Sequence, residues 1–339
     1  MAGDMSVTLT APSPSADPAR PRFWALPWVR FGVRRLGRLL VSLWVLVTAS
    51  FAMIHLIPGD PVRGALGPTA PADLVEARRH ALGLDDPILI QYLHYLKGLV
   101  TGDLGISLAS RLPVSDVVAQ RLPATLFLAV LAFLAAVVLA IPLGVVMGVL
   151  TRRGHGRRTE LAFTTTSIIV ATIPDFLIGV ALVYVFGIQL GWLPVAGDDT
   201  ASAYVLPVFS LAIGPTAILA RIVRVEMVRV LEADFVRTAR AKRLPARAIY
   251  VGHALPNAVT AALTVGGLLL SALVAGTVLV ENVFAWPGLG STIVRSILTK
   301  DYPVVQAIVL VYGVGVLIIN LVVDVALALL DPRSKIRED

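Results

Sequence analysis

The sequence predicts an all-α polytopic membrane protein with six transmembrane helices. The 339 residues are 57% hydrophobic and only 15% charged, with a mean hydropathy of +0.82. A soluble domain of this composition would be unable to cover its surface with polar groups. Crossing a bilayer takes about 20 apolar residues. Six runs meet that length, near 35–57, 124–150, 160–189, 206–228, 258–282 and 305–330.

Composition and motifs exclude several classes of function. The chain has no cysteine, so it forms no disulfide, thiolate metal site or thiol nucleophile. It contains neither a Gly-x-x-x-x-Gly-Lys-Ser/Thr loop nor a His-Glu-x-x-His pattern, and its five histidines are scattered. The net charge of +7 gathers beside apolar runs without interleaved aromatic residues, which argues against nucleic acid. We expect no catalytic residue, no metal site and no cofactor bound by this chain.

The distribution of Lys and Arg predicts the orientation in the membrane. Twenty-one of the 29 basic residues fall in the tail up to Arg38, the turn 151–159, the loop 221–256 and the C-terminal tail. These four segments share one side of a six-span chain, and the other side holds eight. The positive-inside rule therefore places both termini in the cytoplasm.

The apolar runs and the charges divide the chain into segments. Residues 1–30 are rich in proline and predict a disordered cytoplasmic tail. A secretory signal is the alternative for the basic cluster before the first run, but that run is too long and lacks a small-residue cleavage site. The predicted segments are the tail 1–30, the first transmembrane helix 31–57, an external amphipathic segment 58–123, a five-helix core 124–330 with a cytoplasmic loop at 229–257, and a cytoplasmic tail 331–339.

The external segment 58–123 predicts two amphipathic helices. The first covers Asp73–Leu82 and is closed by Gly83. The second has Asp86 as its N-cap and Pro87 at its first position, and it ends before Gly98. Either a structural cap or a docking face for an external partner would suit this segment.

Small and charged residues within the runs predict helix contacts and breaks. Pairs of small residues four apart indicate close packing: Gly144 with Gly148, Gly267 with Ser271, and Ala272 with Gly276. Arg221 and Arg224 indicate where the fourth span emerges into water. Asp324, near Asn320 in the last span, favours a structural role.

Asp175 is the most informative ionisable residue within a span. It follows Pro174 midway along the third run, where the proline frees a backbone carbonyl and loosens the helix. A charge at a helix centre costs about 2.5–3.5 kcal/mol in a bilayer, so it needs a partner or a watery path. Asp175 is therefore either a polar point on a transport path or an internally paired carboxylate that fixes packing.

The stretch after the fifth span predicts an external corner. Trp286 suits the headgroup level, and the sequence Pro-Gly-Leu-Gly that follows it forces a turn. A gating role and a plain interfacial turn are both open. The candidate corner residues are Glu281, Trp286, Pro287, Gly288 and Gly290.

The segment Asp234–Pro256 lies between two apolar runs and is rich in Arg, Lys and Ala. Its charges keep it outside the bilayer, and Pro245 and Pro256 punctuate it. It predicts a short exposed helix, a stop at Leu244–Pro245 and a second helix that leads back into the membrane. Positive charge beside a membrane also serves topology or contacts anionic lipid, which is the alternative interpretation.

This segment resembles the cytoplasmic coupling loop of ABC importer permeases. Its end, His253-Ala254-Leu255-Pro256, falls where that family has Ile-x-Leu-Pro, and Arg237–Lys242 resembles the dipeptide/oligopeptide/nickel branch. Arg243 stands where the family's loop has its glycine. Six further stretches follow in the family's order: Leu56–Pro61, Leu82–Asp85, Gly102–Ser107, Arg121–Thr125, Glu281–Gly290 and Leu330–Arg333.

The resemblance implies a bacterial inner-membrane machine for the import of dipeptides or oligopeptides. It implies a second, related permease that completes a heterodimer within the membrane lipid, two cytoplasmic ATPases that use ATP and Mg, and an external substrate-binding protein. ATPase coupling would rest on Arg237, Thr238, Ala239, Arg240, Ala241, Lys242, Arg243, Leu244, Pro245, Leu255 and Pro256.

Two alternatives remain open on sequence. The same machinery would carry nickel or glutathione instead of longer peptides, although scattered His and five Met residues offer little for a metal path. A stand-alone secondary transporter is the other alternative. It predicts repeated, broken helices with several ionisable groups at the midplane, whereas Asp175 is the single convincing one.

Overall fold

The computed structural model describes residues 27–56, 61–67, 69–81, 83–152 and 156–330. Most of the tail predicted at 1–30, the tail 331–339 and the centre of the basic turn 151–159 lie outside the described residues. The chain divides into two compact units, Met1–Trp44 and Val45–Asp339. Helix α1 (Pro27–Leu56) begins in the first unit and ends in the second, and its part in the first unit presents exposed apolar side chains, among them Leu36 and Trp44.

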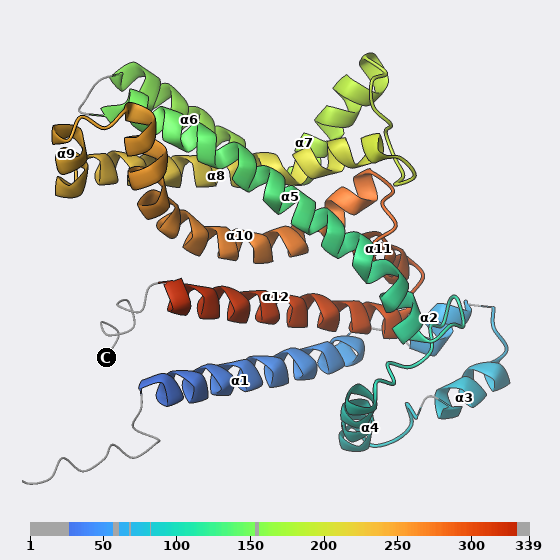
Figure 1. The fold of residues 1–339 in the computed structure, drawn as a ribbon. Coiled ribbons are helices and arrows are strands. Elements are labelled where there is room, and N and C mark those ends of the chain that lie inside the picture. Colours follow the sequence, from blue (N-terminus) through green and yellow to red (C-terminus); the bar gives the residue numbers. More distant parts are fainter. Residues whose placement is uncertain (1–26, 57–60, 68, 82, 153–155, 331–339) are drawn as a thin grey trace, which may run out of the picture. The chain divides into compact units, whose positions relative to one another are not determined.

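The second unit confirms the all-α prediction (Figure 1). Between Val45 and Leu330 the described residues form helices and their connections, and Ile106 and Pro113 form an isolated β-bridge. The longer helices are α5 (Val114–Leu150), α6 (Arg157–Thr172), α8 (Val205–Leu231), α10 (Leu255–Val283) and α12 (Tyr302–Leu330). The shorter ones are α2 (Pro61–Leu66), α3 (Ala72–Ala81), α4 (Ile88–Thr101), α7 (Asp175–Leu182), α9 (Asp234–Ala241) and α11 (Leu289–Leu298).

Five of the described helices are long and apolar enough to cross a membrane: α1, α5, α8, α10 and α12. The third predicted span is instead a bent pair, because α6 and the α7 segment that ends at Gln189 meet at 94°. The break confirms the effect expected of Pro174, which lacks an N–H and disfavours helical backbone at Ile173 before it. Counting the pair as one span gives six.

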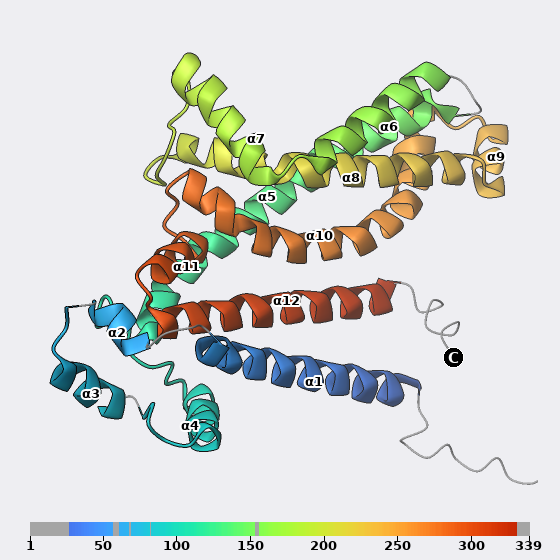
Figure 2. The same cartoon turned by 180° about the vertical axis from the view of Figure 1, so that it is seen from behind.

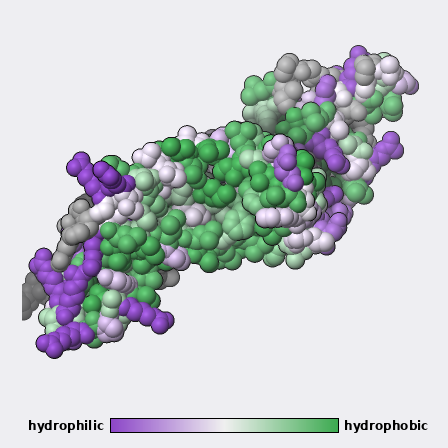
Figure 3. All heavy atoms as spheres, turned by 90° about the horizontal axis from the view of Figure 1, so that it is seen from above, coloured by the Kyte–Doolittle hydropathy of each residue, from purple (hydrophilic) through white to green (hydrophobic). Residues whose placement is uncertain are grey.

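Apolar side chains form much of the surface of the described helices. In the view of Figure 3, hydrophobic residues cover much of the visible surface and hydrophilic residues form separate patches. Many large apolar side chains of α5 and α12 are exposed, such as Val138 at 66% and Val322 at 60%. Such a surface suits lipid or partner helices rather than water.

Close helix packing follows the small residues in two of the three predicted pairs. Gly144 and Gly148 of α5 lie against α8, where a Cβ on Gly144 would come within 2.6 Å of the Ala220 carbonyl oxygen. Gly267 of α10 leaves room for a valine of α12, and the neighbouring Ser271 hydroxyl donates to Asn320 Oδ1 at 3.0 Å. Glycine at these positions lets the backbones approach closely. In the third pair, by contrast, Ala272 is exposed.

The external segment differs from prediction at α4. Its N-cap is Pro87 rather than Asp86, without a side-chain cap, and the Gln91 amide instead donates to the Asp86 carbonyl oxygen at 2.7 Å. The helix also continues past Gly98 to Thr101, and its C-cap Gly102 has a left-handed φ of 79°. Gly98 allows the backbone at Asp103 to approach the helix closely, since a Cβ on Gly98 would lie 2.6 Å from the Asp103 carbonyl oxygen.

Helix α5 begins ten residues before the predicted boundary between the external segment and the core. It starts at Val114 and contains both Pro123 and Pro142. Helix α3 agrees with the predicted Asp73–Leu82, of which Leu82 lies outside the described residues. Gly83 follows it with a left-handed φ of 63°.

Candidate functional site

Helix α9 is fixed at the end of α8 that lies away from α7 and α11 (Figure 2). It begins after Ala233, whose backbone is extended (φ −68°, ψ 151°). Val236, 0% exposed, and Ala239, 6% exposed, pack into an apolar cluster with Met227, Leu231 and the returning segment. Burial of one face makes α9 and the end of α8 one packed body.

The exposed candidate coupling residues lie on the outer face of α9 and in the turn that follows it. Of the candidates, Arg237, Thr238, Ala241, Lys242, Arg243, Leu244 and Pro245 are exposed. Ala239, one of the residues on which coupling was expected to rest, instead turns its side chain into the chain's own core. Arg240 is half-buried, and its Nη2 donates to the Leu231 carbonyl oxygen at 3.4 Å.

The stop after α9 has a Schellman geometry. Leu244 N–H donates to the Ala239 carbonyl oxygen at 3.3 Å, and Arg243 N–H donates to the Arg240 carbonyl oxygen at 2.9 Å. These two bonds close the end of a helix when the residue between them is left-handed. Arg243 fills that position with φ 56°. The geometry explains why a glycine is expected there.

The second helix of the predicted loop is confirmed. A π-helical turn, Ala248–Ala254, leads directly into α10. Leu255 is half-buried and Pro256 is exposed, both in the first turn of α10. Proline suits that position, since its missing N–H would have no helical partner.

A partly buried ion pair that was not predicted lies beside this end. Arg224 of α8 is 9% exposed; its Nη2 lies 2.6 Å from Glu160 Oε1 of α6, and its Nε donates to Thr151 Oγ1 at 2.9 Å. The prediction that Arg224 marks emergence into water is therefore wrong. A charge inside an otherwise apolar run was the available signal, and it pointed to a partner rather than to solvent.

Asp175 begins α7 at the break in the third span, with the exposed Pro174 as its N-cap. Its backbone carbonyl accepts the Ser210 hydroxyl at 2.7 Å. Its half-buried carboxylate faces two glycines, Gly214 of α8 and Gly276 of α10, where Cβ atoms would lie 3.3 and 3.4 Å from its oxygens. No ion pair or side-chain hydrogen bond joins this carboxylate to another described residue.

Glu281 holds the external corner together. It is 0% exposed and accepts the Thr125 hydroxyl at 2.7 Å, Gly290 N–H at 2.6 Å and Ser291 N–H at 3.1 Å. The corner is compact, because a Cβ on Gly290 would lie 2.5 Å from Val278 Cα. Glu281 thereby fastens the start of α11 to α5 and α10.

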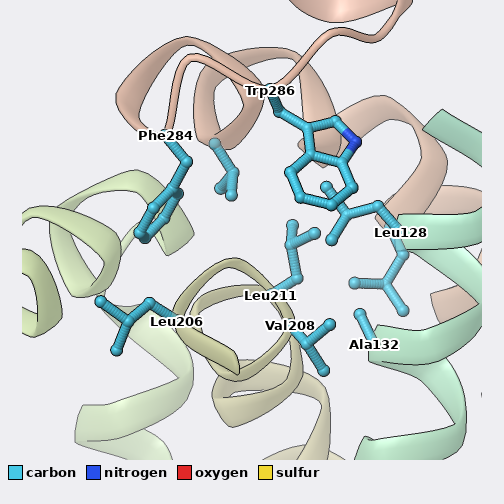
Figure 4. Packing of buried hydrophobic residues seen from close by; sticks show 9 residues of the cluster. Leu128, Ala132, Leu206, Val208, Leu211, Phe284 and Trp286 are labelled. Carbon is cyan, nitrogen blue, oxygen red and sulfur yellow. The ribbon is translucent and has the colours of Figure 1, made fainter. Parts of the chain in front are cut away.

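Trp286 is a core residue rather than a headgroup anchor, so that prediction is wrong. It is 1% exposed, its Nε1–H donates to the Ala124 carbonyl oxygen at 3.2 Å, and its ring stands edge-on to Tyr204 at 4.7 Å. Figure 4 shows it within a cluster with Phe284, Leu128 and other apolar residues. The residue with positive φ in this turn is Ala285, at 48°. Gly288 has an extended backbone, and a Cβ there would collide with the Glu281 carboxylate.

These features form two centres. The candidate coupling residues from Arg237 to Pro245 lie together on and after α9, and Leu255 and Pro256 begin the returning helix. The corner residues form one hydrogen-bonded unit around Glu281, and Pro287 contributes its carbonyl oxygen to Arg121 Nη1 at 3.4 Å. Among the described residues no three His, Asp or Glu side chains gather as a metal site.

Comparison with known proteins identifies the family. Residues 140–336 match the family model described as binding-protein-dependent transport system inner membrane component, and residues 28–129 match the model of its N-terminal part. The glutathione transport system permease proteins GsiC of Escherichia coli strain K12 and of Shigella dysenteriae serotype 1 are each 38% identical over 307 residues, which cover 91% of this chain and 99% of the relative.

A solved structure of an amino acid ABC transporter has a TM-score of 0.47 with this chain at 17% identity, over 63% of this chain and 94% of the other. Family membership rests on the two family models and on the relatives at 38% identity. The relatives are permease subunits and not enzymes. The chain therefore belongs to the inner-membrane components of binding-protein-dependent transport systems, the multi-pass permease subunits of ABC importers.

Proposed function

We propose that this chain forms, with a second related permease, the path by which an ATP-driven importer takes up short peptides. Two cytoplasmic ATPases would supply the energy with ATP and Mg, and an external binding protein would deliver the substrate. Family membership supports the presence of ATPase and binding-protein partners. The excess of basic residues beside α9 supports a cytoplasmic location for this end and for both termini.

The observation that carries this proposal is the two-sided character of α9. Its inner face is packed against α8 through Val236 and Ala239, and its outer face presents Thr238 and Lys242 to solvent. A short helix with a free face suits a groove on a soluble partner. Because the inner face is packed, a displacement of α9 would be transmitted directly to α8.

The transport cycle follows from that connection. Closure of the ATPases on ATP would move α9 and the end of α8 together, and the ion pair between Arg224 and Glu160 would carry the displacement to α6. The cavity between the two permeases would switch between inward- and outward-facing states. The chain makes and breaks no covalent bond; it shifts a conformational equilibrium.

Short peptides are the substrate class that the relatives favour. The GsiC proteins are named as glutathione permeases, and glutathione is itself a tripeptide. Glutathione is therefore the first member of the class to test, with dialanine as a second. Nickel finds no support in the described residues, which hold no cluster of metal ligands. Family membership argues against a stand-alone secondary transporter.

Asp175 supplies a polar point on the proposed path. Its carboxylate lies at the break in the third span, faces Gly214 and Gly276, and has no ion-pair partner among the described residues. An internally paired carboxylate would need such a partner. The α-ammonium group of a peptide would provide the complementary charge as the substrate passes.

Charge reversal on the outer face of α9 tests the proposal. Lys242→Glu is the informative variant, because Lys242 is exposed whereas Arg240 also bonds to its own chain. In proteoliposomes with both permeases, the ATPases and the binding protein, we expect uptake of glutathione and dialanine to fall about tenfold, the effect of about 1.4 kcal/mol of lost coupling.

The matched control is Lys97→Glu, the same exchange at an exposed lysine of α4. It should leave both uptake and ATPase association unchanged. Normal ATPase association together with normal uptake in Lys242→Glu would refute the coupling role of this face.

A further inference from the structure

A pocket with a mixed polar and apolar lining opens at the end of the second unit that lies away from α9. Its volume is about 620 Å³, within the range of about 300–1,000 Å³ typical of small-molecule sites. The start of α5, helix α11, the corner at Trp286 and the loop before α5 line it. We propose that this pocket binds a carboxylate group, an inference that rests on the proposed function.

Two arginines from different helices converge on the pocket. Arg121 comes from the second turn of α5 and Arg295 from the last turn of α11. Neither forms an ion pair with another described residue, and Arg121 makes a long bond of 3.4 Å to the Pro287 carbonyl oxygen. Each guanidinium fork therefore keeps donors available, and its planar geometry matches both oxygens of a carboxylate.

The acidic side chains nearby form no ion pair with these arginines and are bonded elsewhere. Asp301, which lines the pocket, is 2% exposed and accepts bonds from Ser107 Oγ at 2.5 Å, Leu108 N–H at 2.9 Å and Ala109 N–H at 3.3 Å. Its charge is used to fix the loop that forms the rim. Glu281 is likewise bonded within the corner. The accessible charge of the pocket is therefore positive.

The remaining polar lining suits a peptide-like ligand. Gln120, Asn282 and Ser291 add amide and hydroxyl groups, and Val117 and Leu298 add apolar surface. A mixed lining with a few convergent polar groups is the usual character of a small-ligand site. The carboxylate has two possible sources in the proposed importer: the peptide being transported, or an acidic side chain of the docked binding protein.

Arginine-to-glutamine variants test the pocket in the assembled importer, reconstituted in lipid nanodiscs. The variants are Arg121→Gln, Arg295→Gln and the double variant. Arg111→Gln is the control, because Arg111 is exposed at the same end but lies outside the pocket lining. One arm measures binding of glutathione without the binding protein, beside its diethyl ester, in which both carboxylates are capped. The second arm measures the affinity of the substrate-free binding protein for the importer.

The two arms separate the sources of the carboxylate. If the peptide is the ligand, the double variant weakens glutathione binding about tenfold or more and leaves the ester unaffected. If an acidic side chain of the binding protein is the ligand, the loss occurs in the second arm instead. Unchanged affinity in both arms overturns the proposal. Should Arg121→Gln fail to assemble because of its bond to Pro287, Arg295→Gln alone decides.

Failure of the proposed function is distinguishable from failure of the pocket. A wild-type importer that takes up neither glutathione nor dialanine would contradict the substrate class. The affinity of the binding protein in the second arm would still report on Arg121 and Arg295 in that case. Conversely, normal uptake with unchanged affinities in every variant would leave the transport proposal standing and remove the carboxylate site.

Discussion

At the scale of single residues, Arg243 occupies a left-handed backbone position that glycine usually occupies. The Schellman bonds from Arg243 and Leu244 require a left-handed residue after α9, and Arg243 meets that requirement with φ 56°. In a non-glycine residue this conformation lowers the stability of the folded chain by about 1 kcal/mol. The long side chain also places a positive charge beside the outer face of α9.

Arg243→Gly should therefore stabilise the chain by about 1 kcal/mol, because glycine adopts positive φ without a steric penalty. Thermal unfolding of the purified protein in detergent measures the effect. Lys242→Gly is the matched control: its φ of −73° is ordinary, so glycine there should destabilise by about 0.5–1 kcal/mol. A less stable Arg243→Gly protein would mean that contacts of the arginine side chain outweigh the strain.

Glu281 is a second residue whose effect can be predicted. Glu281→Gln keeps the shape but replaces one acceptor oxygen with an NH₂ group, which would face N–H donors at Gly290 and Ser291 or the Thr125 hydroxyl. The loss should be about 1–3 kcal/mol of stability. Asp116→Asn, at an exposed acid of α5, should have no such effect. Equal thermal unfolding of both variants would contradict the structural role of Glu281.

Some residue roles were predictable from sequence and others were not. The break at Pro174 was predictable because its cause is local: proline lacks an N–H and clashes with the preceding residue. Trp286 and Ala239 were not. Sequence shows that a tryptophan ends a span and that an alanine lies on a short helix, but only the tertiary packing decides whether they face lipid, a partner or the core.

At the scale of elements, the bent pair α6 and α7 is the main departure from a bundle of straight helices. The break places the Asp175 carboxylate beside α8 and α10 and not on the lipid side of a continuous helix. Sequence indicated the break, but it could not give the 94° angle or the glycines opposite, because both depend on the packing of distant segments. The start of α5 at Val114 was not predicted either, because Pro123 favoured a helix boundary at that position.

Asp175→Asn should impair uptake more than it impairs assembly of the importer. The amide keeps the size of the carboxylate but removes the charge proposed to attract the peptide ammonium group. Glutathione uptake in proteoliposomes, set beside the yield of intact complex, measures the two effects. Asp199→Asn, at an exposed acid, should change neither. Parallel loss of uptake and assembly would make Asp175 a packing residue instead.

The connection of α6 to α8 depends on Glu160. Glu160→Gln would leave the buried Arg224 without its carboxylate, at a cost of about 1–2 kcal/mol, moderated because Glu160 is 38% exposed. ATP hydrolysis should continue in this variant while uptake per ATP falls, because α6 would follow α8 less closely. Glu226→Gln, in an ion pair with the largely exposed Arg229, is the control. Unchanged uptake per ATP would remove Glu160 from the coupling route.

At the scale of the whole molecule, composition, apolar runs and basic segments sufficed to predict an all-α membrane protein, and the ordered motifs sufficed to predict its family. Both predictions are confirmed. The pocket beneath Arg121 and Arg295 was out of reach, because these residues are 174 positions apart and nothing in the sequence joins them. In the proposed importer the path is shared with a second permease, so this sequence alone would not specify it.

The most direct test of the account is to purify the tagged chain from its native membrane in mild detergent and to identify what accompanies it. The account predicts two kinds of partner in stable association: a second, related permease and cytoplasmic ATPases. Chemical cross-linking would then place the ATPases against Lys242, which directly follows α9. A chain that purifies alone, under conditions that keep related importers intact, would contradict the proposed assembly.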